Sequence, residues 1–176
     1  MNYGTLPRPM NRRSILFLVK FIVVMVALYV IVAIHPVNDH VIEPFSAGLT
    51  WCAGKVVLLM GEQATIEGTV IRTPSFAMDI RNGCNGVEAL ILLVAGMLAY
   101  PARATARIVG IVAGFAIVEL VNVFRIAMLI WIGVHHRASF DFFHVAVWQT
   151  LIILISVALF VFWSRRFAAP TPAAAH

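Results

Sequence analysis

Residues 122–129 read Asn-Val-Phe-Arg-Ile-Ala-Met-Leu and place Arg125 inside a long apolar run from residue 108 to residue 134. A guanidinium group stays protonated in proteins, so it cannot enter hydrocarbon as a neutral group. Even the lowest scales give a cost of about 3 kcal/mol for this charge at the centre of a bilayer. Such a charge persists where it faces the protein interior or a wet cavity, and by default it marks a functional site.

The composition around this run is that of a membrane protein. Of the 176 residues, 61% are hydrophobic and only 12% are charged, about half the charged share of a soluble domain. We predict an all-α polytopic membrane protein with one domain over residues 1–167 and a disordered Pro/Ala-rich tail at 168–176. The net charge of +5 comes from cations at the ends of apolar segments, so nucleic acid is not predicted as a partner.

Four membrane-spanning helices are predicted, at residues 14–34, 84–100, 104–134 and 143–163. We interpret the first as a retained signal anchor, because no small-residue cleavage site follows it. Basic residues flank the start of the first span, the turn between the second and third, and the end of the fourth: Arg8, Arg12, Arg13, Lys20, Arg103, Arg107, Arg165 and Arg166. The positive-inside rule then places both termini in the cytoplasm.

This orientation places residues 37–83 and 135–142 on the outer side. Within the first of these segments, residues 41–61 are apolar but broken by Glu43, Pro44 and Lys55. They predict an amphipathic helix at the outer interface, which either lies on the membrane or dips into it. Residues 64–79 are rich in Thr, Ile and Val around a turn at 72–75, which predicts a short β-hairpin.

The third span is longer than a membrane requires. At 1.5 Å per residue, its thirty-odd residues exceed a hydrocarbon core of about 30 Å. The helix therefore protrudes outward, tilts, or breaks near Asn122. In each case Arg125 lies in the outer half of the membrane, at the level where Cys84 and His144 begin their spans.

Cys84 opens the second span between two Asn-Gly pairs. The free N–H groups and positive dipole at a helix start favour a thiolate, and a nearby guanidinium would lower the pKa of the thiol further. The alternative is a small buried residue at a helix junction.

His144 opens the fourth span, where an imidazole with an ordinary pKa near neutrality can act as a general acid or base. The alternative is an interfacial histidine among aromatic residues, as His135 and His136 illustrate.

Arg125 also has a structural alternative. Glu119 and Asn122 precede it on one broad helix face, and Glu88 lies one turn after Cys84. Either glutamate could form an ion pair that only holds helices together.

The combination of Cys84, Arg125 and His144 predicts acyl transfer through a thioester. In such chemistry the thiol attacks a carbonyl, the imidazole moves protons, and the cation stabilises the thiolate or the oxyanion. Weaker candidates for a supporting role are Asn82, Asn85, Glu88 and Asn122. No metal or organic cofactor is implied.

From about residue 41 to residue 166, the chain resembles the exosortase/archaeosortase membrane cysteine transpeptidases. The resemblance is carried by Asn-Gly-Cys-Asn-Gly-Val-Glu at 82–88, Asn-Val-Phe-Arg-Ile at 122–126 and Phe-His at 143–144. Its small size and short loops look most like the exosortase H branch. The family's Cys, Arg and His would correspond to Cys84, Arg125 and His144. Many members have Ser where this chain has Asn85, and asparagine can still donate a hydrogen bond at a helix start.

The resemblance implies a sorting protease of a bacterial inner membrane, with its active site on the periplasmic side. Its partners would be secreted proteins that end in a short motif, a membrane helix and a basic tail. The enzyme would cleave near the motif and pass the new carboxyl end to an acceptor that the sequence does not identify, or to water.

Two other functions are compatible with the sequence. Cys52 and Cys84 could form a reversible disulfide on the outer side, as in a membrane thiol oxidoreductase, although no Cys-x-x-Cys pair is present. A non-enzymatic scaffold would need Arg125 only for an ion pair with Glu88 or Glu119.

Overall fold

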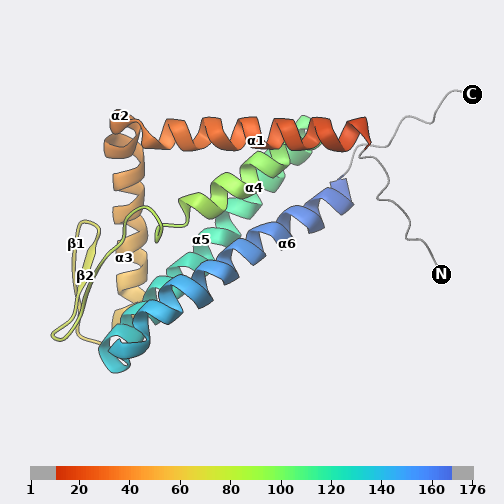
Figure 1. Ribbon diagram of the computed structural model, residues 1–176. Helices are drawn as coiled ribbons and strands as arrows, with labels where there is room; N and C mark the ends of the chain where they lie inside the picture. The colour runs from red at the N-terminus through yellow and green to blue at the C-terminus, as the bar shows by residue number, and fades with distance from the viewer. Residues whose placement is uncertain (1–10, 168–176) are drawn as a thin grey trace, which may run out of the picture.

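The computed structural model describes residues 11–167, which are mostly helical (Figure 1). The longer helices are α1 (Arg12–Ala33), α3 (Glu43–Leu59), α4 (Val87–Ala99), α5 (Ala104–His135) and α6 (Gln149–Phe167). Short helical segments connect them: α2 (His35–Val37), η1 (Asn38–Ile42), η2 (Arg137–Ser139) and the π-helical η3 (Phe142–Trp148). The predicted tail at 168–176 and Arg8 lie outside the described residues.

Three helical segments are long and apolar enough to cross a membrane: α1, α5, and η3 with α6 over Phe142–Phe167. The predicted second span is shorter than expected, because α4 has 13 residues, roughly 20 Å at 1.5 Å per residue. A full crossing of hydrocarbon needs about 30 Å. The structure therefore confirms three of the four predicted spans. Because α5 continues for 32 residues without interruption, the third span does not break near Asn122.

Helices α4, α5 and α6 lie side by side, and α1 and α3 extend from them in different directions (Figure 1). Helix α1 packs on α4, α3 packs on α5, and α4 contacts both α5 and α6. No residue of α1 is buried, so its apolar surface is available to lipid. By contrast, α5 buries a continuous face that includes Asn122 and Arg125.

The predicted hairpin is part of a three-stranded antiparallel sheet, in the order β1 (Thr65–Glu67), β2 (Val70–Arg72) and β3 (Ala77–Asp79). The predicted turn joins β2 to β3, where Thr73 N donates to Phe76 O over 2.7 Å. The additional strand, β1, precedes a turn at Gly68, whose φ of +59° suits glycine. The sheet therefore has one strand more than the predicted hairpin, and this strand precedes the predicted pair.

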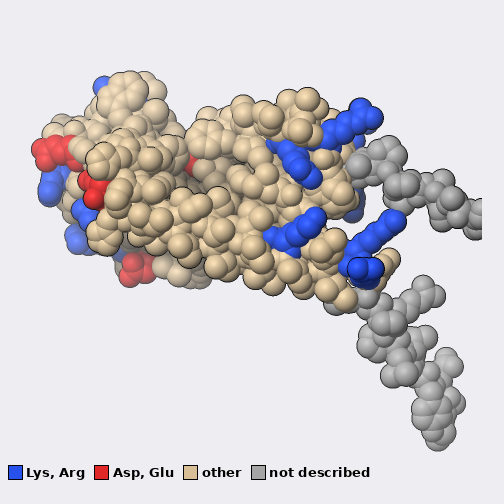
Figure 2. Space-filling model, turned by 90° about the horizontal axis from the view of Figure 1, so that it is seen from above, with Lys and Arg blue, Asp and Glu red and all other residues tan. Residues whose placement is uncertain are grey.

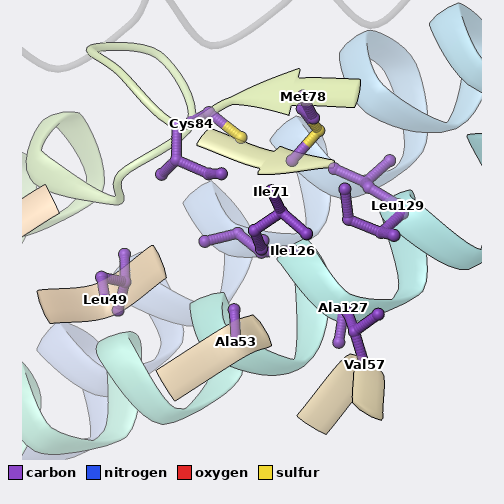
Figure 3. Packing of buried hydrophobic residues seen from close by; sticks show 11 residues of the cluster. Leu49, Ala53, Val57, Ile71, Met78, Cys84, Ile126, Ala127 and Leu129 are labelled. Carbon is purple, nitrogen blue, oxygen red and sulfur yellow. The ribbon is translucent and has the colours of Figure 1, made fainter. Parts of the chain in front are cut away.

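Side chains from α3, the sheet and α5 form a hydrophobic cluster, and Cys84 lies at its edge (Figure 3). Leu49, Ala53 and Val57 come from α3. These residues share one face of the helix, so the predicted amphipathic helix is present and buries this face against α5. The cluster fixes the sheet to α5, and the chain leaving β3 runs directly to Cys84.

Candidate active site

Cys84 lies in the turn between β3 and α4, three residues before the first helical residue. Its backbone N–H donates to Arg81 O over 2.9 Å, and its side chain is only 6% exposed. The helix begins after Gly86, whose φ of +80° reverses the chain. The thiol is thus close to a helix start, as predicted, but on the turn rather than in the helix.

Asn85 ties this turn to α3. Its buried side-chain Nδ2 donates to Ser46 Oγ over 3.0 Å and to Asn82 Oδ1 over 3.2 Å. Its Oδ1 accepts from Val87 N, the first N–H of α4, over 3.2 Å. Asn82 and Asn85 therefore act together in positioning the turn. Ser46 was not identified from the sequence, because it lies in an apolar segment without a distinguishing pattern.

Glu88 supports the turn from the other side. Its Oε1 accepts from the backbone N–H of Gly83 over 2.7 Å. This bond fixes the Asn82–Gly83 peptide, so Glu88 contacts the turn that carries Cys84.

Arg125 is 1% exposed, and its guanidinium reaches the same turn. Nη2 donates to Gly83 O over 3.3 Å and to Gln149 Oε1 over 3.1 Å, whereas the buried Nε has no partner in the described part of the chain. No carboxylate within residues 11–167 lies within 4.0 Å of this guanidinium. The alternative of a structural ion pair in direct contact with Glu88 or Glu119 is therefore wrong.

Gln149 is a site residue that the sequence analysis missed. It is the first residue of α6 and follows the π-helical segment η3. π-Helical turns inside longer helices are frequent at functional sites, because they redirect side chains. A glutamine within an apolar span was a usable signal for this position.

His144 lies in η3 and is half-buried. Its ring stacks on Phe140 with a centroid distance of 5.4 Å, and Phe140 packs against the cluster that contains Cys84. Arg125 lies within electrostatic range of both Cys84 and His144. No hydrogen bond joins His144 to Cys84 among the described residues, and such bonds often tighten only when substrate is present.

Asn122 lies against the turn at Gly86. A Cβ at Gly86 would lie 2.9 Å from Asn122 Nδ2 and 2.8 Å from Glu119 Oε1. Asn122 Nδ2 donates to Glu119 Oε2 over 3.5 Å. The pair of side chains on α5 therefore packs tightly beneath the glycine that starts α4.

Burial raises the pKa of the Cys84 thiol above its ordinary value; the charge of Arg125 opposes this shift, and Glu88 adds to it. The sequence predicted a lowered pKa, which is wrong for this state because desolvation outweighs the nearby cation. The thiol is therefore neutral at pH 7 and needs a base to become a nucleophile.

The two cysteines are both free, with Cys52 exposed and Cys84 buried. The disulfide that a thiol oxidoreductase would need is not formed. Within residues 11–167, no group of three His, Cys, Asp or Glu side chains could hold a metal ion.

Comparison with known proteins gives one family. The family model described as Transmembrane exosortase (Exosortase_EpsH) matches residues 10–163. No curated protein and no solved structure matches the chain. The matched range includes Cys84, Arg125 and His144.

Proposed function

Because this chain belongs to the transmembrane exosortase family of membrane transpeptidases that process sorting signals, we propose that Cys84 is its nucleophile. The substrates are secreted proteins that end in a short motif, a membrane helix and a basic tail. The enzyme cleaves a peptide bond near the motif and forms a thioester. The short size and loops of the chain favour the exosortase H branch.

One observation carries this proposal: Arg125 is buried against Gly83, next to Cys84, and no carboxylate within residues 11–167 lies within 4.0 Å of its guanidinium. A buried guanidinium without a contacting carboxylate is costly unless it serves an anion. In acyl transfer that anion is the oxyanion of a tetrahedral intermediate. The unpartnered Nε supplies a donor that is not already used by Gly83 or Gln149.

The chemistry proceeds in two halves. His144 takes the proton from Cys84 Sγ, and the thiolate attacks the carbonyl carbon of the scissile peptide. When the C–N bond breaks, the leaving amine takes that proton from the imidazolium, and the acyl group remains on sulfur as a thioester. An acceptor amine, hydroxyl or water then attacks the thioester, gives its proton to His144, and the proton returns to the released thiolate.

The charge distribution supports a periplasmic active site. Figure 2 shows Lys and Arg side chains without Asp or Glu at the end where α1 begins and α6 ends, whereas at the opposite end Asp and Glu are mixed with further Lys and Arg. By the positive-inside rule the basic end faces the cytoplasm. Cys84 then lies toward the outer side of a bacterial inner membrane, with both termini inside.

The test is Cys84→Ala, with Cys52→Ala as the matched control. The probe is a secreted reporter that carries the C-terminal motif, helix and basic end of a protein from the same genome. We expect C84A to insert normally but to leave the reporter at full length, whereas C52A processes it like the wild type. In the wild type, hydroxylamine should cleave the thioester, which frees the Cys84 thiol and releases the cleaved reporter as its hydroxamate. Reporter processing by inserted C84A would overturn the proposal.

A further inference from the structure

A polar cavity of about 290 Å³ lies beside the chain that leads into Cys84. Its polar wall consists of Asn38, Ser46, Thr69 and Asn82, and its apolar wall includes Ile42 and Ile80. These residues come from η1, α3, the turn between β1 and β2, and the segment that follows β3. The size is at the lower end of the range of ligand sites, about 300–1,000 Å³, which is room for a short segment of chain rather than for one water molecule.

The cavity and the reactive turn share side chains. Ser46 Oγ and Asn82 Oδ1, both on the cavity wall, accept from Nδ2 of Asn85. Asn82 precedes Cys84 by two residues, and two residues of extended chain span about 7 Å. The wall of the cavity at Asn82 is therefore no more than about 7 Å along the chain from Cys84.

The cavity wall has unused hydrogen-bonding capacity. Ser46 is 2% exposed, and its hydroxyl accepts from Asn85 but donates to no group within the described residues. The backbone N–H of Arg81 likewise has no partner in this part of the chain. A second hollow of about 140 Å³ shares Asn38 and Asn82 with the cavity, and Asn82 Nδ2 donates to Asn38 Oδ1 over 3.5 Å at this shared wall.

The charges at the rim do not make an anion site. Glu43 is an acid at the start of α3, and Arg81 is held by Asp79 with an N–O distance of 2.6 Å. A phosphate group would need free cations, whereas amide, hydroxyl and backbone groups suit a peptide, which has both donors and acceptors. The lining therefore favours a polypeptide over a phospholipid headgroup.

We propose that this cavity is a substrate subsite that holds two or three extended residues of the sorting motif next to the bond that Cys84 attacks. The proposal rests on the proposed function, since the occupant is its protein substrate. It assigns Asn38 and Ser46 to substrate binding and adds this contact to the role of Asn82 in the turn.

Photo-crosslinking tests occupancy without requiring turnover. In the Cys84→Ala protein, a benzophenone amino acid replaces either Asn38, on the cavity wall, or Gln63, which is exposed in the segment between α3 and β1. The probe is the tail-bearing reporter used above. We expect a cross-link from position 38 to residues flanking the cleavage site and little from position 63. Equal cross-linking from both positions, or none from position 38, would overturn the proposal.

Filling the cavity tests its role in the reaction. Asn38→Trp should lower kcat/KM for the reporter at least tenfold, mainly through KM, whereas Gln63→Trp should not change it. Alkylation of Cys84 by iodoacetamide, a small reagent, should keep its wild-type rate in N38W. If N38W does not insert, Glu43→Trp fills the same space from the exposed rim. An unchanged KM in the inserted variant would contradict the proposal.

Different outcomes would contradict the proposed function and the assignment of the cavity as a substrate subsite. If the wild type does not process the reporter, the proposed function fails, and the cross-link from position 38 still decides whether the cavity binds the tail. If the wild type processes the reporter but the filled variants do so equally well, only the subsite assignment fails.

Discussion

Arg125 and Gly83 are joined across 42 positions of sequence by a hydrogen bond of 3.3 Å from guanidinium Nη2 to the carbonyl oxygen. The bond connects α5 to the turn that carries Cys84, so it fixes the position of the guanidinium relative to this turn. Glu88 Oε1 accepts from the N–H of the same glycine over 2.7 Å, so each of the two peptide groups that flank the Gly83 Cα is held by a side chain.

Arg125→Lys should remove most activity while preserving the positive charge. An ammonium has no planar fork with which to contact Gly83 and Gln149 and still present a third donor to an oxyanion. Loss of one oxyanion donor typically lowers kcat by about 10²–10³. Reporter processing measures this, with membrane insertion as the control. Activity within threefold of the wild type would show that charge alone suffices.

Gln149→Glu should lower activity because the new carboxylate would neutralise the charge of Arg125. The new carboxylate would replace an amide oxygen that accepts from Arg125 Nη2 over 3.1 Å, and a close ion pair would offset the charge that the oxyanion needs. We expect reporter processing to fall about 10²-fold with thermal stability retained. Gln63→Glu adds the same charge at an exposed position and should have no effect. Full activity in Q149E would mean that Gln149 does not set the charge of the site.

Alkylation of Cys84 should begin at a higher pH than alkylation of Cys52. Burial favours the neutral thiol and raises the pKa of Cys84, and Arg125 opposes this rise. Only the thiolate reacts, so reactivity appears as the pH approaches the raised pKa. Arg125→Ala removes the opposing charge and should move the onset further upward. Labelling rates in detergent between pH 6 and pH 11 measure both shifts, and an onset below that of Cys52 would contradict them.

Gly86→Ala should destabilise the protein more than Gly68→Ala does. Both glycines have positive φ, so each alanine costs about 1–2 kcal/mol in a left-handed backbone. Only at Gly86 would the Cβ also approach Glu119 Oε1 and Asn122 Nδ2, at 2.8 and 2.9 Å, and such overpacking adds about 1–3 kcal/mol. Thermal unfolding in detergent compares the two variants. Equal losses would show that Asn122 and Glu119 can move aside.

The position of Arg125 could be predicted because one physical cost dominates it. A guanidinium in an apolar run has to face the protein interior. The number of residues between the start of the span and Arg125 then determines how deep Arg125 lies in the membrane. The same reasoning predicted that Cys84 lies at the membrane depth of Arg125. In the structure, the hydrogen bond from Arg125 to Gly83 O joins the segments that carry these two residues. For His144 the sequence predicted the neighbourhood, whereas its ring orientation depends on the π-helical turn.

Other contacts depend on helix rotation, which hydrophobicity alone does not determine in a membrane span. Gln149 faces Arg125 and Ser46 faces Asn85 because of how whole helices pack. The alternative of an ion pair with Arg125 is not realised for the same reason: Glu88 bonds to Gly83, and Glu119 interacts with Asn122. Burial of Cys84 by side chains from distant segments likewise reversed the predicted direction of its pKa shift.

On the proposed topology, the short length of α4 determines how deep the turn with Cys84 lies in the membrane. With 13 residues it covers roughly 20 Å of a hydrocarbon layer of about 30 Å, so on the proposed topology the cysteine turn is recessed into the outer leaflet. On the proposed function, a substrate anchored by its basic tail at the cytoplasmic surface would meet the thiol at a fixed height. The cut would then be placed by distance from that anchor as well as by the motif.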